Sequence, residues 1–293
     1  MATVIYPEIY IFNVIKLIVY FYIILLTISN MEEATFYIDG SYFIFYRFYA
    51  LMQWWNIAKK DEPLGIPIEN KEFVEKFKTS FNQKIKEIPK KCGIHLKKTK
   101  VAIYAARDCP RKDIWRRKIF EDYKENRSYE GFQGGPFFAM VYDEDLFGKA
   151  GVITTFYHPH LEADDCIAIR VKKQIIETPE AEVYIITSDH DYLQLVAPNI
   201  HIINLRYKKV ADSKTGSYDA KRNLFIKIVM GDNSDNIPSI FPKCGFITAK
   251  KCFENPEFYK KKCSVESHKI FKRNNQIINF DFIPQELQCE FLT

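Results

Sequence analysis

The hydrophobic and polar positions of the chain separate short apolar runs from longer amphipathic segments. Each short run is followed by Gly, polar or acidic residues, as strands commonly are. We predict four strands on this basis: Ala34–Ile38, Lys100–Ala105, Gly151–Phe156 and Glu182–Thr187. Because helical segments alternate with these strands, the pattern predicts an α/β fold with a parallel sheet.

The predicted helices have apolar residues three or four positions apart. Lys71–Ile88 follows this spacing and carries lysines on its other face, and Pro89 is expected to close the helix. Further helical or amphipathic segments are expected at 41–57, 164–177 and the basic stretch 111–127. The composition changes near Lys221, so we expect one α/β domain over 31–220 and a mostly helical region over 221–293.

Residues 1–30 form a separate N-terminal segment. Residues 9–28 read IYIFNVIKLIVYFYIILLTI, which is long enough to span a bilayer. No basic region precedes this run and no small-residue cleavage site follows it, so it is a poor signal peptide. Three interpretations stay open: a membrane anchor, a buried or partner-bound segment, or an upstream extension before a start at Met31. The last is favoured, since a predicted strand follows Met31 at once.

Charge and cysteine content narrow the possible classes of protein. The 293 residues include 42 Lys and Arg and carry a formal net charge of +5, which is compatible with a polyanionic partner. The 7 cysteines are odd in number and show no CxxC spacing. They indicate reduced thiols in an intracellular protein and exclude a disulfide framework or a cysteine zinc site.

Carboxylates follow the predicted strands and open one predicted helix. They are Asp39, Asp108, Asp189 and Asp191 after strands, and Glu162, Asp164 and Asp165 within LEADDCIAI. Turn-forming or helix-capping aspartates are the alternative interpretation for each one taken alone. In open parallel sheets, however, the carboxyl ends of the strands meet at one edge. Gathered there, the carboxylates would repel unless divalent cations neutralised them, and oxygen ligands suit Mg²⁺ or Mn²⁺ better than Zn²⁺.

Two other residue types near the acids have simpler interpretations. His158, His160 and His190 are expected to be structural or to support the ligands. The segment 111–127 interleaves Arg and Lys with Trp, Phe and Tyr. A solvated helix face would explain this composition, but cations for phosphates and aromatic rings for unstacked bases favour a surface for single-stranded DNA.

Five sequence blocks, taken together, resemble the structure-specific 5′-nucleases. They are YIDGSYFIFYRFYA, RDCPRKDIWRRKIFEDYKENR, LEADDCIAI, ITSDHDYLQL and VMGDNSDNIPSIFPKCGFITAKK. Flap endonucleases and the 5′-nuclease domains of bacterial DNA polymerases carry similar blocks in this order. The likeness covers about 36–253 and is compatible with a viral or phage-like member. It implies a PIN-like nuclease domain with a helical arch, followed by a helix–hairpin–helix-like DNA-binding region.

The resemblance also implies a two-metal site, with two Mg²⁺ ions or with Mn²⁺. The implied metal ligands are Asp39, Asp108, Glu162, Asp164, Asp165, Asp189, Asp191, Asp232 and Asp235. Arg116 and Lys124 match the basic residues that the family directs at the scissile phosphate. The expected DNA-binding residues are Arg111, Arg117, Arg127, Lys243, Gly245, Thr248, Lys250 and Lys251. Many relatives have a hairpin close to G-V-x-G-I-G, of which the segment 239–245 keeps one glycine.

The resemblance therefore implies a metal-dependent 5′-nuclease, a flap endonuclease or 5′-3′ exonuclease acting on branched or 5′-ended DNA in replication, repair or recombination. Two alternatives stay open: a catalytically silent DNA-binding scaffold of the same fold, and a single-strand ribonuclease. The duplex-gripping block after residue 230 argues against the ribonuclease. Other replication or repair proteins are expected as further partners, and a membrane only if 9–28 is an anchor. An intracellular location with DNA follows from this interpretation.

Overall fold

The computed structural model describes residues 32–128 and 130–293. The expectations for the N-terminal extension 1–30, for the apolar run 9–28 and for a start at Met31 lie outside these residues. Among the residues that the structure describes, no helix combines the length and apolar character needed to cross a bilayer. The seven cysteines all lie in the described part and are free thiols.

A five-stranded sheet forms the centre of the molecule, with the order β3-β2-β1-β4-β5 and every neighbouring pair parallel. The strands are β1 Glu32–Asp39, β2 Thr99–Ala106, β3 Thr154–Phe156, β4 Glu182–Ile186 and β5 Ile200–Ile203. The predicted α/β class with a parallel sheet is confirmed, as are the four predicted strands. β5 was not predicted, because His201 interrupts its short apolar run.

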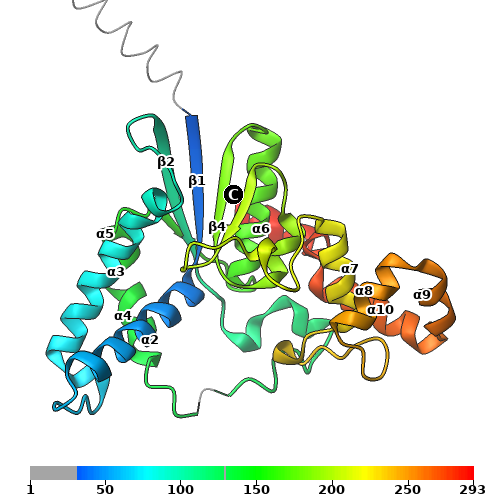
Figure 1. Ribbon diagram of the computed structural model, residues 1–293, viewed down its shortest axis with the longest axis horizontal. Helices are drawn as coiled ribbons and strands as arrows, with labels where there is room; N and C mark the ends of the chain where they lie inside the picture. Colours follow the sequence, from blue (N-terminus) through cyan, green and yellow to red (C-terminus); the bar gives the residue numbers. More distant parts are fainter. Residues whose placement is uncertain (1–31, 129) are drawn as a thin grey trace, which may run out of the picture.

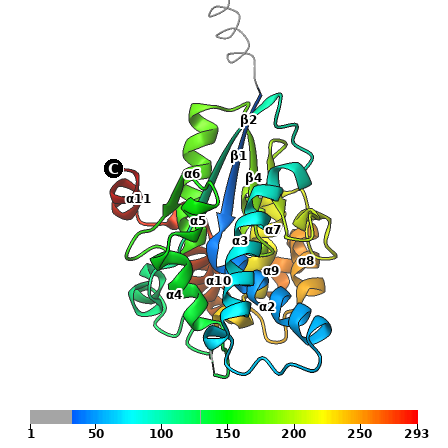
Figure 2. The ribbon, with the colours of Figure 1, turned by 90° about the vertical axis from the view of Figure 1, so that its left-hand side faces the viewer.

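Helices cover both faces of this sheet and produce three layers. On one side, α2 Gly40–Ala58, α3 Lys71–Lys91, α4 Gly135–Asp143 and α5 Leu146–Lys149 pack with inward residues of β1 such as Phe36 and Ile38. On the other side, α6 Ala163–Glu177 packs with Tyr37 and Val183. Figure 1 shows α2 to α5 on the left of the central strands and α6 on the right, and Figure 2 turns the first group toward the viewer.

The predicted helix from Lys71 forms, with one correction at its end. Asn70 caps it by accepting a hydrogen bond from the Phe73 N–H at 3.0 Å, and most of its apolar face is buried, with Val74 partly exposed. Pro89 does not close the helix, which continues to Lys91. A proline removes only its own N–H, and the next turn still forms because the Cys92 N–H donates to the Ile88 carbonyl at 2.9 Å.

The basic segment 111–127 is not a continuous helix. It holds two short 3₁₀ helices, η2 Arg111–Asp113 and η3 Trp115–Lys118, followed by turns, so the expected arch has no long helix here. The aromatic ring of Tyr123 turns inward, into a small core shared with Ile228 and Ile277 of the C-terminal helices. Packing against elements distant in sequence overrides the local amphipathic pattern.

The C-terminal region is helical, as expected. It comprises α7 Ala220–Met230, α8 Phe246–Glu254, α9 Pro256–Lys262, α10 Val265–Ile278 and α11 Gln285–Leu292, and α7 to α10 extend to the right in Figure 1. The remaining 3₁₀ helices are η1 Pro67–Glu69, η4 His190–Leu195, η5 Val210–Asp212, η6 Asn233–Asp235 and η7 Phe280–Phe282. α11 returns to the sheet, since Leu287 and Phe291 share the core of α6. The predicted boundary after residue 220 falls one residue inside α7, and the division into 31–220 and 221–293 stays a prediction.

Candidate metal centre

The carboxyl ends of the strands gather most of the predicted acids around one cavity of about 360 Å³, whose lining does not include Asp165 and Asp191. Asp39 is the last residue of β1, Asp108 lies two residues beyond β2, and Asp189 follows β4. The other acidic residues in the lining are Glu162, Asp164, Asp232 and Asp235. The sheet order explains this convergence, because β1, β2 and β4 are adjacent and point the same way.

Helix capping and turn formation also occur here, and they fix the acids in place. Asp39 caps α2 through Oδ1, which accepts from the Tyr42 N–H at 3.0 Å, while Oδ2 accepts from Thr187 Oγ1 at 3.2 Å. Asp108 Oδ1 accepts from the Ala163 N–H at 2.8 Å, at the start of α6. The interpretation of capping aspartates and that of a cation site are thus compatible, since each cap orients a carboxylate at the cavity.

Two groups of carboxylates lie close enough to share a cation. In each group, one ligand atom per residue lies within 4.8 Å of the others: Glu162, Asp164 and Asp165 in the first, and Asp191, Asp232 and Asp235 in the second. We call these the first and the second carboxylate group. The first lies at the start of α6, and the second joins η4 to the turn after α7. Their oxygen-only donor set suits a hard divalent cation.

Burial and mutual repulsion perturb several of these acids. Burial, with a contribution from Asp108, raises the pKa of Asp39 to about 6. Burial and the neighbouring Asp191 raise the pKa of Asp189 to about 7. Burial also raises the pKa of Asp164 well above its usual range. The carboxyls cannot all ionise cheaply at neutral pH, and a bound divalent cation would remove that penalty.

Arg116 occupies a different place from the one expected of a phosphate-facing arginine. Its side chain is buried, with Nη2 2.7 Å from Asp165 Oδ1, Nη1 2.7 Å from Asp165 Oδ2, and Nη1 2.9 Å from Glu162 Oε2. Its Nε donates to the Ile277 carbonyl at 2.8 Å. A buried guanidinium needs partners for its donors, and the acids of α6 supply them. Arg116 therefore holds the first carboxylate group and does not line the cavity.

Lys124 and Arg127 do line the cavity. Lys124 forms an ion pair with Glu162 and lies 3.7 Å from Asp235 Oδ2, and its backbone is in the left-handed region with φ 59°. Burial opposes the charge of Lys124, but Glu162 and Asp235 outweigh it and raise the pKa. Arg127 forms an ion pair with Asp235. Lys124 and Arg116 do not share a helix face, because no continuous helix joins them.

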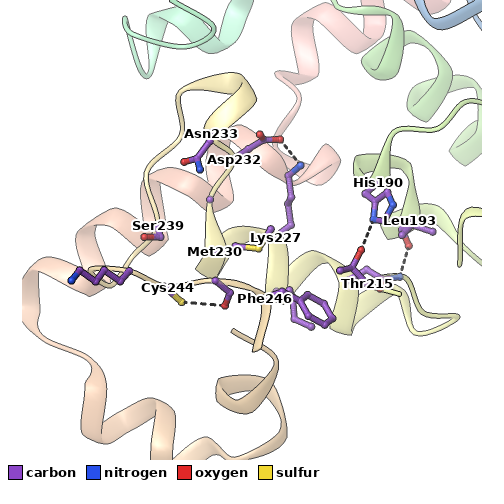
Figure 3. A pocket seen from close by; sticks show the side chains of 15 residues that line it. His190, Leu193, Thr215, Lys227, Met230, Asp232, Asn233, Ser239, Cys244 and Phe246 are labelled. Atoms are coloured by element: carbon purple, nitrogen blue, oxygen red, sulfur yellow. Dashed lines mark hydrogen bonds and ion pairs between the residues drawn. The ribbon is translucent and has the colours of Figure 1, made fainter. Parts of the chain in front are cut away.

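One cation at the centre was not predicted from the sequence. Lys227 of α7 lies with its Nζ 2.5 Å from both Asp191 Oδ1 and Asp232 Oδ2, in the second carboxylate group. Figure 3 shows its side chain reaching toward Asp232. Its position five residues before the aspartate of the G-D pair is the only signal in the sequence that could have marked it.

The expected DNA-binding residues lie in two places outside this cavity, Arg127 excepted. Arg111 donates to the Arg127 carbonyl at 2.8 Å, and Arg117 pairs with Glu125 at 2.8 Å. Lys243 and Gly245 line a neighbouring cavity of about 640 Å³, drawn in Figure 3. Thr248, Lys250 and Lys251 follow on α8, which begins after Gly245.

The histidines contact structural partners. His158 Nε2 lies 3.2 Å from Glu290 Oε2, and His160 Nδ1 lies 2.9 Å from the Asp113 carbonyl. His190 Nε2 lies 3.5 Å from Ser213 Oγ, and His190 Nδ1 lies 3.4 Å from Thr215 Oγ1. None of the three belongs to either carboxylate group, in agreement with the expectation for them.

Comparison with known proteins then decides the family. Residues 34–223 match the family described as 5′-3′ exonuclease, N-terminal resolvase-like domain. The chain belongs to this 5′-3′ exonuclease family. The match covers every implied metal ligand except Asp232 and Asp235, and it confirms the resemblance to the 5′-nucleases. The family is one of nucleases.

The curated relatives of this exonuclease-family chain match it over only part of their own length. DNA polymerase I of Rhizobium leguminosarum is 28% identical over 233 residues, which cover 76% of this chain and 20% of the polymerase. A 5′-3′ exonuclease of Buchnera aphidicola (from Acyrthosiphon pisum) is 34% identical over 142 residues, 46% of each protein. The chain therefore spans less than half the length of these relatives.

Solved structures share the fold of this family member. The T5 5′-exonuclease with bound zinc ions aligns with a TM-score of 0.58 and 16% identity, over 88% of this chain and 96% of that one. The bacteriophage T5 flap endonuclease in a complex with DNA and metal ions aligns with a TM-score of 0.58 and 14% identity, over the same shares. At this identity the likeness establishes the α/β fold.

Proposed function

We propose that this member of the 5′-3′ exonuclease family is a divalent-metal-dependent, structure-specific 5′-nuclease. It hydrolyses phosphodiesters of branched or 5′-ended DNA in replication, repair or recombination. The observation that carries the proposal is the convergence of acids from three strand ends, α6 and the turn after α7 on one cavity that Lys124 and Arg127 also line. The complexes of the T5 proteins with metal ions and with DNA support the same function.

The residues of the two carboxylate groups fit two divalent ions, and we propose Mg²⁺, for which Mn²⁺ would substitute. Glu162 and Asp164, with Asp39 and Asp108 beside them, would hold one ion, and the second carboxylate group with Asp189 would hold the other. Bound ions would supply activation of a water and stabilisation of the leaving oxygen. Both oxygens of Asp165 accept from Arg116, so Asp165 orients the first group and is a weaker candidate for a direct ligand.

The cationic side chains then have separate roles. Lys124 and Arg127, in the cavity lining, would contact the phosphate at the reacting bond and offset its charge. Arg116, buried beneath them, keeps Glu162 and Asp165 in position. Lys243, Gly245, Thr248, Lys250 and Lys251 would bind duplex phosphates, and Arg111 and Arg117 would bind the single strand beyond the cavity.

Cleavage of a 5′-labelled flap substrate by the full chain, with Mg²⁺ and with EDTA, tests the proposal. Asp189→Asn should abolish cleavage but keep DNA binding in Ca²⁺, because it removes one ligand charge and leaves the basic surface unchanged. Asp281→Asn is the matched control, since Asp281 pairs with Lys172 at the surface.

Three results would contradict the proposal. Cleavage by Asp189→Asn at the wild-type rate under saturating Mg²⁺ would remove the metal assignment. Binding of flap DNA by the wild-type chain without any cleavage would favour a catalytically silent scaffold. Cleavage of single-stranded RNA in place of flap DNA would favour a ribonuclease.

A further inference from the structure

Lys227 lies where a divalent ion of the second carboxylate group would lie. Its Nζ is equidistant, at 2.5 Å, from Asp191 Oδ1 and Asp232 Oδ2. These two residues, with Asp235, have ligand atoms within 4.8 Å of one another. The ammonium group therefore occupies the space between oxygens that are candidates for the same cation.

The ammonium group satisfies this position only in part. Lys227 donates a hydrogen bond to Asp232 Oδ2, but the buried Asp191 Oδ1 has no hydrogen-bond partner despite its short distance to Nζ. An ammonium donor needs a suitable angle, whereas a hard divalent cation binds carboxylate oxygens without that constraint. Asp235 has its own cations in Lys124 and Arg127, so the single charge of Lys227 is shared by Asp191 and Asp232 and compensates them only in part. The group is thus better matched to a divalent ion than to Lys227.

The backbone fixes Asp232, whereas Lys227 is held in place only by its ion pairs at the end of a long side chain. Gly231 has φ 70°, and a Cβ there would lie 2.4 Å from the Ile237 carbonyl oxygen, so the turn that presents Asp232 is fixed. The Lys227 side chain, in contrast, has four rotatable bonds. It also lines the cavity of about 640 Å³ shown in Figure 3, together with Lys243 and Gly245.

We propose that Lys227 is an exchangeable counter-cation of the second carboxylate group. Without a divalent ion its ammonium group pairs with Asp191 and Asp232, and binding of the ion displaces it into the adjacent cavity beside Lys243. This proposal rests on the proposed metal-dependent function.

Two consequences follow from the exchange. Lys227 competes with the second ion and weakens its binding, so the first ion binds more tightly. Each displaced ammonium group also adds positive charge to a cavity where phosphates of DNA would bind. The second ion would therefore strengthen binding of DNA phosphates in that cavity. By thermodynamic linkage, DNA phosphates bound there would strengthen binding of the second ion by the same factor.

Binding of Mn²⁺ to the full chain, measured by calorimetry and by electron paramagnetic resonance without DNA, tests the exchange. The wild-type chain should bind two ions with unequal affinity. Lys227→Met should bind the weaker ion at least on the order of tenfold more tightly, because the competing charge is gone. Lys149→Met, whose ammonium group is exposed and 3.9 Å from Glu144, should bind both ions as the wild type does.

Lysine labelling of the wild-type chain provides a readout that does not depend on the folding of a variant. Acetylation followed by mass spectrometry should find Lys227 protected in EDTA and labelled in Mn²⁺, with Lys149 labelled equally in both. Unchanged Mn²⁺ affinity in Lys227→Met, or unchanged labelling of Lys227, would overturn the exchange and leave the nuclease proposal intact. A wild-type chain that binds no Mn²⁺ would overturn both.

Discussion

Replacement of Arg116 by methionine should destabilise the protein strongly while filling similar volume. Arg116 is 2% exposed, and its guanidinium nitrogens lie 2.7 to 2.9 Å from carboxylate oxygens of Asp165 and Glu162, which are 0% and 3% exposed. The substitution leaves both carboxylates buried without this partner. Breaking a buried ion pair in this way costs about 3–5 kcal/mol. We expect a decrease of that size in the free energy of unfolding.

The assay is urea unfolding in EDTA at pH 8, followed by circular dichroism. Arg117→Met is the matched control, because Arg117 pairs with Glu125, whose side chain is 62% exposed. A surface pair of this kind contributes about 0–1 kcal/mol. The double variant Arg116→Met with Asp165→Asn should be destabilised by less than the sum of the single variants, since the asparagine removes the stranded charge.

Two results would refute this reasoning. One is an Arg116→Met protein within about 1 kcal/mol of the wild type, the value expected of an exposed ion pair. The other is strict additivity in the double variant, which would show that Arg116 does not act through Asp165.

Two further predictions concern pH and DNA. The folded-state pKa values of Asp39 and Asp189 are raised to about 6 and about 7, so their stabilising effect is present below about pH 4 and declines as pH rises to 7. Thermal scans in EDTA should therefore show a melting temperature that falls from pH 5 to pH 8, and Mg²⁺ should raise it most at pH 8; a flat profile would contradict the raised pKa values of these acids. Lys250→Ala with Lys251→Ala should lower affinity for duplex DNA and reduce the salt slope by about 0.9 for each phosphate that the variant no longer neutralises, with the single-turnover rate unchanged. Fluorescence anisotropy in Ca²⁺ over a salt series measures this, and a reduced rate at unchanged affinity would contradict it.

Local patterns predicted the fold where local forces determine it. The helix from Lys71 follows its apolar spacing, and acids at or just beyond the ends of β1 and β2 mark the sheet edge. The turns in the segment 111–127 were not predicted. The ring of Tyr123 packs with Ile228 and Ile277, which lie far away in the sequence, and a local pattern does not contain this contact. The helix end predicted at Pro89 was wrong by two residues, because a proline in the last turn of a helix removes only one hydrogen bond.

The candidate centre was predictable in its acids and less so in its cations. Strand ends and motif order identify the carboxylates without knowledge of the fold. The role of a basic residue depends on which way its long side chain turns. Arg116 turns inward to α6, and Lys227 lies across the second carboxylate group. The spacing of apolar residues in the sequence does not predict the direction of either side chain.

The central position of β1 also determines when, during synthesis, the sheet and the acid cavity can form. Ala34, near the N-terminal end of β1, pairs with Val101 on one side and Glu182 on the other, and Arg116 needs the carbonyl of Ile277. A chain that leaves the ribosome from its N-terminus exposes these partners progressively later. The surroundings of the acid cavity are therefore complete only after Ile277 has left the ribosome. A growing chain that has emerged only as far as Asp235 carries every acid of the cavity lining but lacks this partner of Arg116.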